Sequence, residues 1–313
     1  MVRPITSSNS TNVVACVESM SASYELTLAV ERYDLDATLG CGQAFGWERD
    51  GQGWTGVVGG EWIRLIGMAG GIRIQTAKPL KDPAVLTDYL QTSVDIRAVI
   101  RTFPTADTHL RDAVKACRGL RLLRQDPWEC LASFILSSTK QIVQIRQIVA
   151  VLSERHGRPV EVPEGASPRY AFPTAEQISA LSESDLRACK MGFRAPYLSQ
   201  AARRVSSGEI DLQAIARMEM SAARTELMKL DGVGEKIADC VLLFGYGFPE
   251  AFPVDVWVRR VLVDFYFRGR DVKPERLRRF IATHFGVNAG YAQQYLFHHV
   301  RLMNGKGDAV EGD

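Results

Sequence analysis

The pattern of apolar and polar residues changes once along the chain, near residue 122. From about Tyr24 to Thr76, apolar and polar positions alternate in short runs, which are separated by the turn-forming sequences RDGQG, VVGGEW and GMAGG. Alternation with a period of two, broken by glycine-rich turns, is typical of antiparallel strands joined by hairpins. We therefore expect an antiparallel β-sheet domain over residues 23–122, which ends in helices at 79–103 and 109–122.

Helical periodicity dominates from Asp126 onward. The longest helical segment reads WECLASFILSSTKQIVQIRQIVAVLSERHG, and a polar break near residues 137–140 divides it into two predicted helices. Thr174 and Gln177 have the spacing of a capping box at the start of a further helix. The sequence thus predicts an α+β protein in which a mainly helical region, residues 123–313, follows the sheet.

Composition indicates the class of protein. With 313 residues, of which 46% are hydrophobic, the chain can bury a sizeable core and hold two or three domains. The polar start, MVRPITSSNSTN, lacks the apolar segment of a secretion signal, so we expect residues 1–22 to form a flexible tail. Because no apolar run reaches the length of about 18 residues that a membrane-spanning helix needs, we expect a soluble intracellular protein with no membrane partner.

Charge and cysteine content narrow the kinds of site. A net charge of +2 is too small to indicate nucleic-acid binding by bulk charge, which would have to come from local arginine clusters. The six cysteines include no pair at CxxC spacing, so neither a zinc site nor a disulfide framework is expected. The chemistry must therefore come from another motif.

That motif lies in residues 227–258, LMKLDGVGEKIADCVLLFGYGFPEAFPVDVWV. Helical sequence flanks LDGVG, so Gly232 and Gly234 are expected to form a tight hairpin between two helices. The backbone N–H groups of Val233 and Gly234 would then point outward at the positive end of the second helix. Such an end binds anions, and a DNA phosphate is the natural candidate.

Three reactive side chains follow the hairpin. Lys236 lies in the first turn of the second helix, where the positive helix end favours a neutral amine, which is a nucleophile. Cys240 comes four residues later on the same helix face. Asp255, in PVDVW, can cap the next helix and direct its second oxygen into the same pocket. Each residue also has a simpler interpretation: a phosphate contact for Lys236, only a helix cap for Asp255 and a buried apolar residue for Cys240.

The segment resembles the helix-hairpin-helix, Gly-Pro-Asp superfamily of DNA glycosylases, with GVGEK carrying the lysine and PVD the aspartate. Within that superfamily, GVGEKIADC…PVDV most resembles the 8-oxoguanine DNA glycosylase/AP lyase family, and the similarity runs from about residue 24 to about residue 303. No cysteine follows Cys240, so the four-cysteine iron–sulfur cluster of the endonuclease III and adenine-glycosylase branches is absent. The resemblance implies that the N-terminal sheet is TBP-like and that the helical region is the catalytic part.

The chemistry of base removal fits these residues. Breaking the bond between C1′ and N9 passes through a cation-like sugar, which needs a nucleophile below the sugar and a carboxylate nearby, roles suited to Lys236 and Asp255. An amine nucleophile leaves a Schiff base at C1′, which acidifies the C2′ proton and permits strand cleavage by β-elimination. We therefore expect a bifunctional enzyme, and the resemblance implies 8-oxoguanine as its substrate. Two alternatives stay open: a glycosylase of the same fold for another damaged purine, such as ring-opened guanine, and a non-catalytic DNA-binding protein.

The resemblance also implies a pocket for a base flipped out of the duplex. NAGYAQQYLFHHV is similar to the family's AGWAQ…LF pattern. Phe297 would stack on one face of the base, Cys240 would contact the other face, and Gln293 would hydrogen-bond the Watson–Crick edge. LGCGQAFGW resembles the family's GQ-F-W motif, in which the carbonyl of Gly42 would accept the N7 hydrogen that 8-oxoguanine has and guanine lacks. Taken singly, a core aromatic, a surface amide and a hairpin glycine are the simpler interpretations of Phe297, Gln293 and Gly42.

Other residues would hold the DNA around the flipped base. MGFRAPY resembles the segment in which Phe193 would wedge into the base stack and Arg194 would contact the orphaned base. The chain departs from the family at Thr139, within what is usually an asparagine-rich run, and at Gln144, where an arginine is usual. We therefore expect a weaker preference for cytosine opposite the lesion. Trp257 stands where the family usually has a histidine that touches phosphate, and we expect activity to survive this change.

The hairpin implies one bound ion and no catalytic cofactor. Gly232, Val233 and Gly234 would contact the DNA backbone, and the carbonyls of Leu230 and Val233 would surround a structural monovalent cation. The expected partner is double-stranded DNA containing 8-oxoguanine, bound by a monomer. The expected location is the cytoplasm of a bacterium, on the chromosome, or the nucleus or mitochondrion of a eukaryote.

Overall fold

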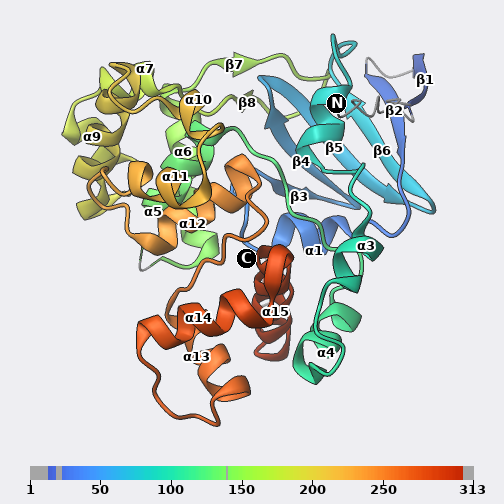
Figure 1. The fold of residues 1–313 in the computed structure, drawn as a ribbon. Coiled ribbons are helices and arrows are strands. Elements are labelled where there is room, and N and C mark those ends of the chain that lie inside the picture. Colours follow the sequence, from blue (N-terminus) through green and yellow to red (C-terminus); the bar gives the residue numbers. More distant parts are fainter. Residues whose placement is uncertain (1–12, 19–22, 139, 306–313) are drawn as a thin grey trace, which may run out of the picture.

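Six antiparallel strands form a sheet in the N-terminal part of the chain (Figure 1). The computed structural model describes residues 13–18, 23–138 and 140–305. The sheet order is β1-β2-β6-β5-β4-β3, and the strands are β1 (Val13–Glu18), β2 (Tyr24–Ala29), β3 (Glu48–Asp50), β4 (Gly53–Val58), β5 (Glu61–Met68) and β6 (Gly71–Thr76). Register places Ile74 between Leu26 and Leu65, so the apolar positions of the alternating pattern share one buried face. The prediction of an α+β protein with an N-terminal antiparallel sheet is confirmed.

The prediction of a tail over residues 1–22 is wrong for β1. This strand pairs with β2, with Val13 opposite Leu28 and Val14 opposite Thr27. The run VVACVE is rich in valine, which favours strands, and the edge of β2 offers it unpaired backbone groups. Residues 1–12 and 19–22 lie outside the part that the structure describes.

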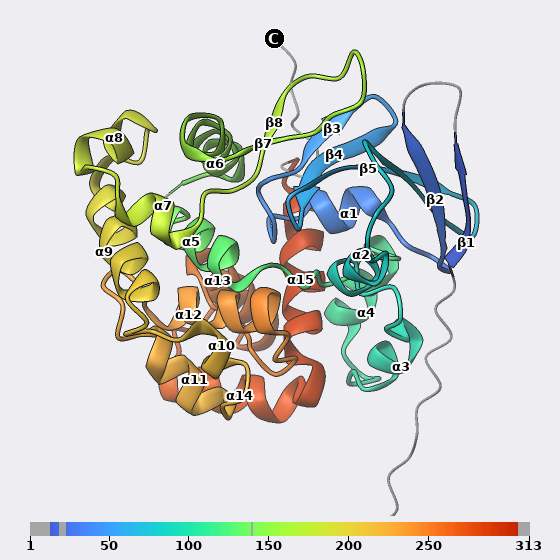
Figure 2. The ribbon, with the colours of Figure 1, turned by 90° about the horizontal axis from the view of Figure 1, so that it is seen from above.

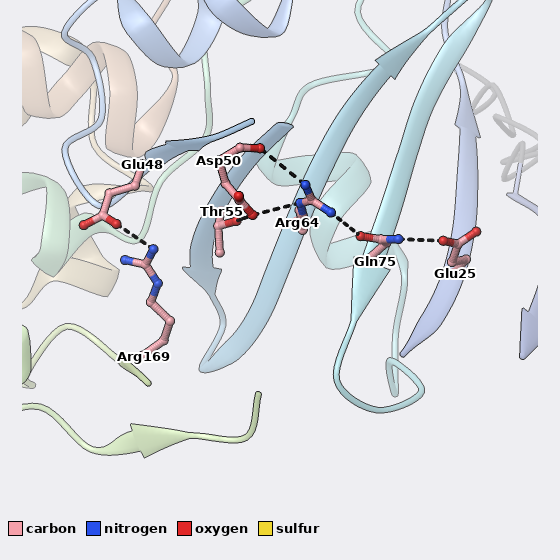
Figure 3. Close-up of polar contacts among 7 residues, drawn as sticks. All are labelled: Glu25, Glu48, Asp50, Thr55, Arg64, Gln75 and Arg169. Carbon is pink, nitrogen blue, oxygen red and sulfur yellow. Dashed lines mark hydrogen bonds and ion pairs between the residues drawn. The ribbon is translucent and has the colours of Figure 1, made fainter. Parts of the chain in front are cut away.

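The opposite face of the sheet carries a row of polar side chains (Figure 3). Gln75 Nε2 donates to Glu25 Oε1 at 2.6 Å, and Arg64 Nη1 donates to Gln75 Oε1 at 3.2 Å. Arg64 also forms an ion pair with Asp50 at 3.0 Å. The row crosses from β2 to β3 on the face opposite the buried side chains of Leu26, Leu65 and Ile74.

A short hairpin reaches from the helical region to the edge of the sheet. It consists of β7 (Pro159–Val160) and β8 (Arg169–Tyr170). Arg169 Nη2 donates to Glu48 Oε2 of β3 at 2.6 Å, which joins the two parts of the chain (Figure 3).

Three short helices lead away from the sheet: α2 (Ala84–Tyr89), α3 (Ile96–Arg101) and α4 (Thr108–Ala116). The expected helix over 79–103 is therefore two helices, because Gln91 has a positive φ of 52° and Asp95 begins α3 as a new cap. The helix expected to reach residue 122 ends at Ala116. Gly119 follows with φ +93°, a conformation that an α-helix cannot contain.

The remaining chain is helical, as predicted. The break between α5 (Pro127–Leu136) and α6 (Ile142–His156) and the capping box of Thr174 and Gln177 are both confirmed. The later elements are α7 (Ala175–Ser179), α8 (Glu183–Ala188), η1 (Gly192–Arg194), α9 (Ala195–Ser206), α10 (Leu212–Ile215), α11 (Met220–Leu227), α12 (Glu235–Val241), η2 (Leu242–Tyr246), α13 (Val256–Tyr266), α14 (Pro274–His284), η3 (Gly286–Asn288) and α15 (Ala289–Met303). None of the helices in the described ranges could span a membrane.

Helix α15 lies at the centre of the molecule, packed against both α4 and α13 (Figures 1 and 2). Asp107 strengthens this junction, because its buried carboxylate accepts three hydrogen bonds. Leu110 N of α4 donates at 2.9 Å, Tyr266 Oη at 2.8 Å and His284 Nε2 at 2.8 Å. Helix α4 is thereby bound to the C-terminal helices.

The buried apolar side chains form two clusters, one on the sheet and one among the helices. The loop between α1 (Leu35–Gly40) and β3 contributes to both. Cys41 and Phe45 pack into the helical cluster, whereas Ala44 and Trp47 pack into the sheet cluster. The two clusters therefore hold Gly42, which lies in this loop, from both sides.

Candidate active site

A hairpin joins α11 and α12, as predicted, and its first glycine is required there. Gly232 has φ +81°, and a Cβ at this position would lie 2.8 Å from a ring carbon of Tyr197. Val233 is buried and donates its N–H to Leu230 O at 3.0 Å, so the expectation that this N–H points outward is wrong, because the tight hairpin bonds it internally. Gly234 is the N-cap of α12, and no other atom lies near the place that its Cβ would take. The first turn of α12 is therefore open to a ligand that approaches the backbone.

Lys236, in that first turn, reaches across to the end of α5. Its Nζ donates to Ser137 Oγ at 3.1 Å, and the Ser137 hydroxyl donates in turn to Phe134 O at 2.7 Å. Nζ also lies 5.3 Å from the centre of the Phe134 ring. Because the Ser137 hydroxyl donates its hydrogen to the Phe134 carbonyl, its oxygen can accept a hydrogen bond from Lys236 Nζ, which fixes the position of the amine.

Asp255 caps α13, as predicted. Its Oδ1 accepts from Val258 N at 2.7 Å. No ion pair between Lys236 and Asp255 occurs among the salt bridges of the described residues, yet both charges act on the thiol of Cys240. The amine and the carboxylate are therefore both close enough to Cys240 to influence the pKa of its thiol.

Cys240 is buried in the helical core. Burial raises the pKa of its thiol to about 12, although the positive charge of Lys236 opposes this shift. The thiol is thus neutral at physiological pH and serves as a packing surface.

A small cavity lies beside the first turn of α13, and its volume is about 10 Å³. It is lined by Phe252, Val258, Val261, Leu262, Gln293, Leu296 and Phe297. Gln293 is only 4% exposed, and its buried Oε1 has no hydrogen-bond partner among the residues that the structure describes. Such an acceptor is costly unless a ligand satisfies it. The cavity holds about one water molecule, so a purine enters only if the half-buried Phe297 and its neighbours move apart.

The loop that contains Gly42 is held tightly. Gly42 has φ +85°, and a Cβ there would lie 2.3 Å from Ile142 Cδ1 of α6, so only glycine fits. The Gln43 side chain donates to Thr38 O and Arg121 O, both at 2.8 Å. Gln294 Nε2 of α15 donates to Cys41 O at 3.4 Å. Residues from the sheet domain and from α15 therefore meet at one place, as the pocket requires.

Comparison with known proteins agrees with this geometry. The family model "8-oxoguanine DNA glycosylase, N-terminal domain" matches residues 25–131, and the model "HhH-GPD superfamily base excision DNA repair protein" matches residues 132–284. A probable N-glycosylase/DNA lyase of Methanothermobacter thermautotrophicus is 34% identical over 69% of this chain and 75% of its own length. The chain belongs to the 8-oxoguanine DNA glycosylase family.

Other members of the 8-oxoguanine DNA glycosylase family are similar over most of the chain. The N-glycosylase/DNA lyase of Arabidopsis thaliana is 27% identical over 88% of this chain and 79% of its own length. The crystal structure of the Clostridium acetobutylicum 8-oxoguanine glycosylase/lyase, in complex with double-stranded DNA containing cytosine opposite 8-oxoguanine, superposes with a TM-score of 0.85. That enzyme is 31% identical, and the match covers 94% of this chain and 99% of the other.

The residues expected to hold the orphaned base differ in exposure in this glycosylase. Phe193 is 56% exposed, as a wedge must be, but Arg194 is only 2% exposed. The Arg194 guanidinium lies 4.2 Å from the Phe193 ring centre and donates to the carbonyls of Met191 and Ser138. The guanidinium therefore supports Phe193 and the segment that follows α5.

Two departures from the family pattern have clear positions. Gln144 caps α6, since its Oε1 accepts from Gln141 N at 3.1 Å. Trp257 is 44% exposed next to Asp255, which rules out a purely core role. Thr139 lies outside the residues that the structure describes.

Sequence reasoning missed Ser137 as a partner of the proposed nucleophile. The hydrogen bond joins residues 99 positions apart. A serine at the end of a helix carries no sign of such a contact, because helix ends commonly have polar residues. Only the packing of α5 against α12 reveals it.

Proposed function

We propose that this chain excises 8-oxoguanine from duplex DNA through a Schiff base on Lys236 and then cleaves the strand by β-elimination. One observation carries the assignment of residues. Val258, whose N–H is capped by Asp255, also lines the cavity that Gln293 lines, and the charges of Lys236 and Asp255 both influence the pKa of Cys240. These contacts support a site in which a nucleophile, a carboxylate and a base-reading amide act together.

The reaction begins when the target nucleotide is flipped out of the duplex. A lone pair of Lys236 Nζ forms a bond to C1′, and the electron pair of the C1′–N9 bond leaves with the base, which takes up a proton. The Asp255 carboxylate stabilises the positive charge that develops on the sugar. Loss of the Nζ protons and opening of the sugar ring give the Schiff base. Removal of a C2′ proton then expels the 3′ phosphate and breaks the strand.

Four residues read the base in this proposal. Phe297 and Cys240 contact its two faces, and Gln293 bonds its Watson–Crick edge. The Gly42 carbonyl accepts the N7 hydrogen of 8-oxoguanine, whereas guanine presents a lone pair there and is repelled. A single such hydrogen bond contributes about 1–3 kcal/mol, or one to two powers of ten.

The hairpin supplies the remaining contacts with DNA. Gly232 and Gly234 offer backbone N–H groups to a phosphate, while Val233 lies between them with its own N–H bonded to Leu230 O. The carbonyls of Leu230 and Val233 hold a monovalent cation that strengthens this contact. Leu230 O fits this role because, within the described part of the chain, it accepts one N–H, from Val233, and a carbonyl oxygen has a second lone pair. The enzyme acts as a monomer wherever the DNA lies: on the bacterial chromosome in the cytoplasm, or in a eukaryotic nucleus or mitochondrion.

Borohydride trapping on duplex DNA with a single 8-oxoguanine tests the proposal. The wild-type chain is compared with Lys236→Gln and with Lys115→Gln, which changes an exposed lysine of α4. We expect a covalent adduct from the wild type and from Lys115→Gln, on the damaged strand only, and none from Lys236→Gln. Base release without an adduct would make water the nucleophile. If the base is released only from a duplex that contains ring-opened guanine, the substrate is ring-opened guanine and not 8-oxoguanine. If the chain binds the duplex but releases no base, it is a non-catalytic DNA-binding protein.

A further inference from the structure

Arg301 of α15 touches two proposed walls of the base pocket. It lies one helical turn after Phe297, and its guanidinium carbon is 5.7 Å from the centre of that ring. Its Nη1 lies 3.4 Å from the place that a Cβ on Gly42 would take. The side chain therefore contacts both the loop that carries the Gly42 carbonyl and the ring that would stack on the base.

A second arginine, Arg146, lies near the same loop but makes different contacts. Arg146 of α6 donates to Leu39 O at 2.9 Å, and its guanidinium lies 5.6 Å from the Trp54 ring centre. These contacts bind Arg146 to the sheet side of the loop. Arg301 instead lies beside Gly42 and the Phe297 ring.

We propose that Arg301 is a positioning residue that sets the Gly42 carbonyl against the Phe297 ring and so determines selectivity for 8-oxoguanine. This inference rests on the proposed function. A cation above an aromatic face holds the plane of the ring, and the same guanidinium supports the loop from which the discriminating hydrogen bond comes. Hydrogen bonds weaken steeply when their angle changes, so a small shift of the loop costs base recognition.

The chemistry of strand cleavage does not depend on this contact. Lys236 and Asp255 are held by other elements, through Ser137 and Val258. A preformed abasic site has no base to be read. Loss of Arg301 therefore slows excision of 8-oxoguanine and leaves cleavage at an abasic site unchanged. An arginine that merely bound a DNA phosphate would instead weaken both reactions equally.

Single-turnover rates on two duplexes test this role, one with 8-oxoguanine and one with a preformed abasic site. The variants are Arg301→Gln, Arg301→Lys and the control Arg97→Gln, which removes an exposed ion pair with Glu31. For Arg301→Gln we expect excision to fall about tenfold and abasic cleavage to stay within about twofold of the wild type. Arg301→Lys keeps the charge and should recover part of the excision rate.

Three outcomes overturn the inference: unchanged excision in Arg301→Gln, an equal loss in both reactions, or a lysine variant no better than the glutamine variant. A thermal melt of each variant separates loss of folding from loss of recognition, because an unfolded fraction lowers both rates together. If the wild-type chain itself releases no 8-oxoguanine, the proposed function fails. If the wild type is active and Arg301→Gln matches it, only the role of Arg301 fails.

Discussion

Replacing Ser137 with alanine removes the acceptor that holds the proposed nucleophile. In the structure the Ser137 hydroxyl donates to Phe134 O and accepts from Lys236 Nζ at 3.1 Å. The alanine side chain fits the same space, so helix α5 should keep its fold. The amine would keep its contact with the Phe134 ring but would lose its directional partner.

The size of the effect follows from the kind of bond. A hydrogen bond from a neutral amine contributes about 0.5–1.5 kcal/mol, which corresponds to about 2- to 13-fold in rate if the amine loses its orientation. Lys236 is half-buried, so water can partly replace the serine. We therefore expect about threefold slower formation of the Schiff base, within this range.

The assay is the rate of borohydride trapping on a preformed abasic duplex, which reports on Lys236 without base recognition. Ser137→Thr keeps the hydroxyl and should restore most of the rate. Ser133→Ala, one turn earlier on the same helix, serves as the matched control and should trap at the wild-type rate. Wild-type trapping by Ser137→Ala would refute the reasoning, and so would an equal loss in Ser133→Ala.

Three further predictions concern stability, surface tolerance and opposite-base preference. Burial alone would raise the pKa of Asp107, but hydrogen bonds from Leu110 N, His284 and Tyr266 outweigh it and hold the pKa below its ordinary value. The carboxylate therefore stabilises the fold above about pH 4, and this stability is lost as the pH falls through the lowered pKa. Asp107→Asn should unfold in less urea at pH 7, with a gap from the wild type that narrows in acid; a constant gap would contradict this. For Trp257→His we expect a free energy of unfolding within about 0.5 kcal/mol of the wild type, because the indole is largely at the surface. This variant should still excise 8-oxoguanine, and a large drop in its melting temperature would count against the prediction. Gln144 is engaged as a helix cap, so excision rates opposite cytosine, adenine, guanine and thymine should differ little, and activity opposite cytosine alone would contradict that expectation.

Local signals allowed parts of the fold to be predicted from the sequence. The capping box forms as expected, with Gln177 N donating to Thr174 Oγ1 at 3.2 Å and Thr174 N donating to Gln177 Oε1 at 2.9 Å. Asp255 likewise caps α13. These contacts span only three residues, so the sequence contains all the information that they need.

Contacts between distant segments were not predictable in this way. The burial of Arg194 depends on the carbonyl of Ser138, which belongs to another element. Strand β1 forms because the edge of β2 accepts it, although the polar residues before it suggested a tail. A pairing of this kind depends on which surfaces meet after folding, and no local pattern in one sequence specifies that.

The position of the loop around Gly42 determines which activity a destabilising mutation would impair. Its side chains are shared between the sheet cluster and the helical cluster, while Lys236, Ser137 and Asp255 belong to the helices alone. A substitution that destabilises the sheet would therefore displace the loop that carries the Gly42 carbonyl. It would leave Lys236, Ser137 and Asp255 in place. The resulting enzyme would still break strands at abasic sites while overlooking the oxidised bases that should precede them, a separation of function caused by a mutation far from any reacting atom.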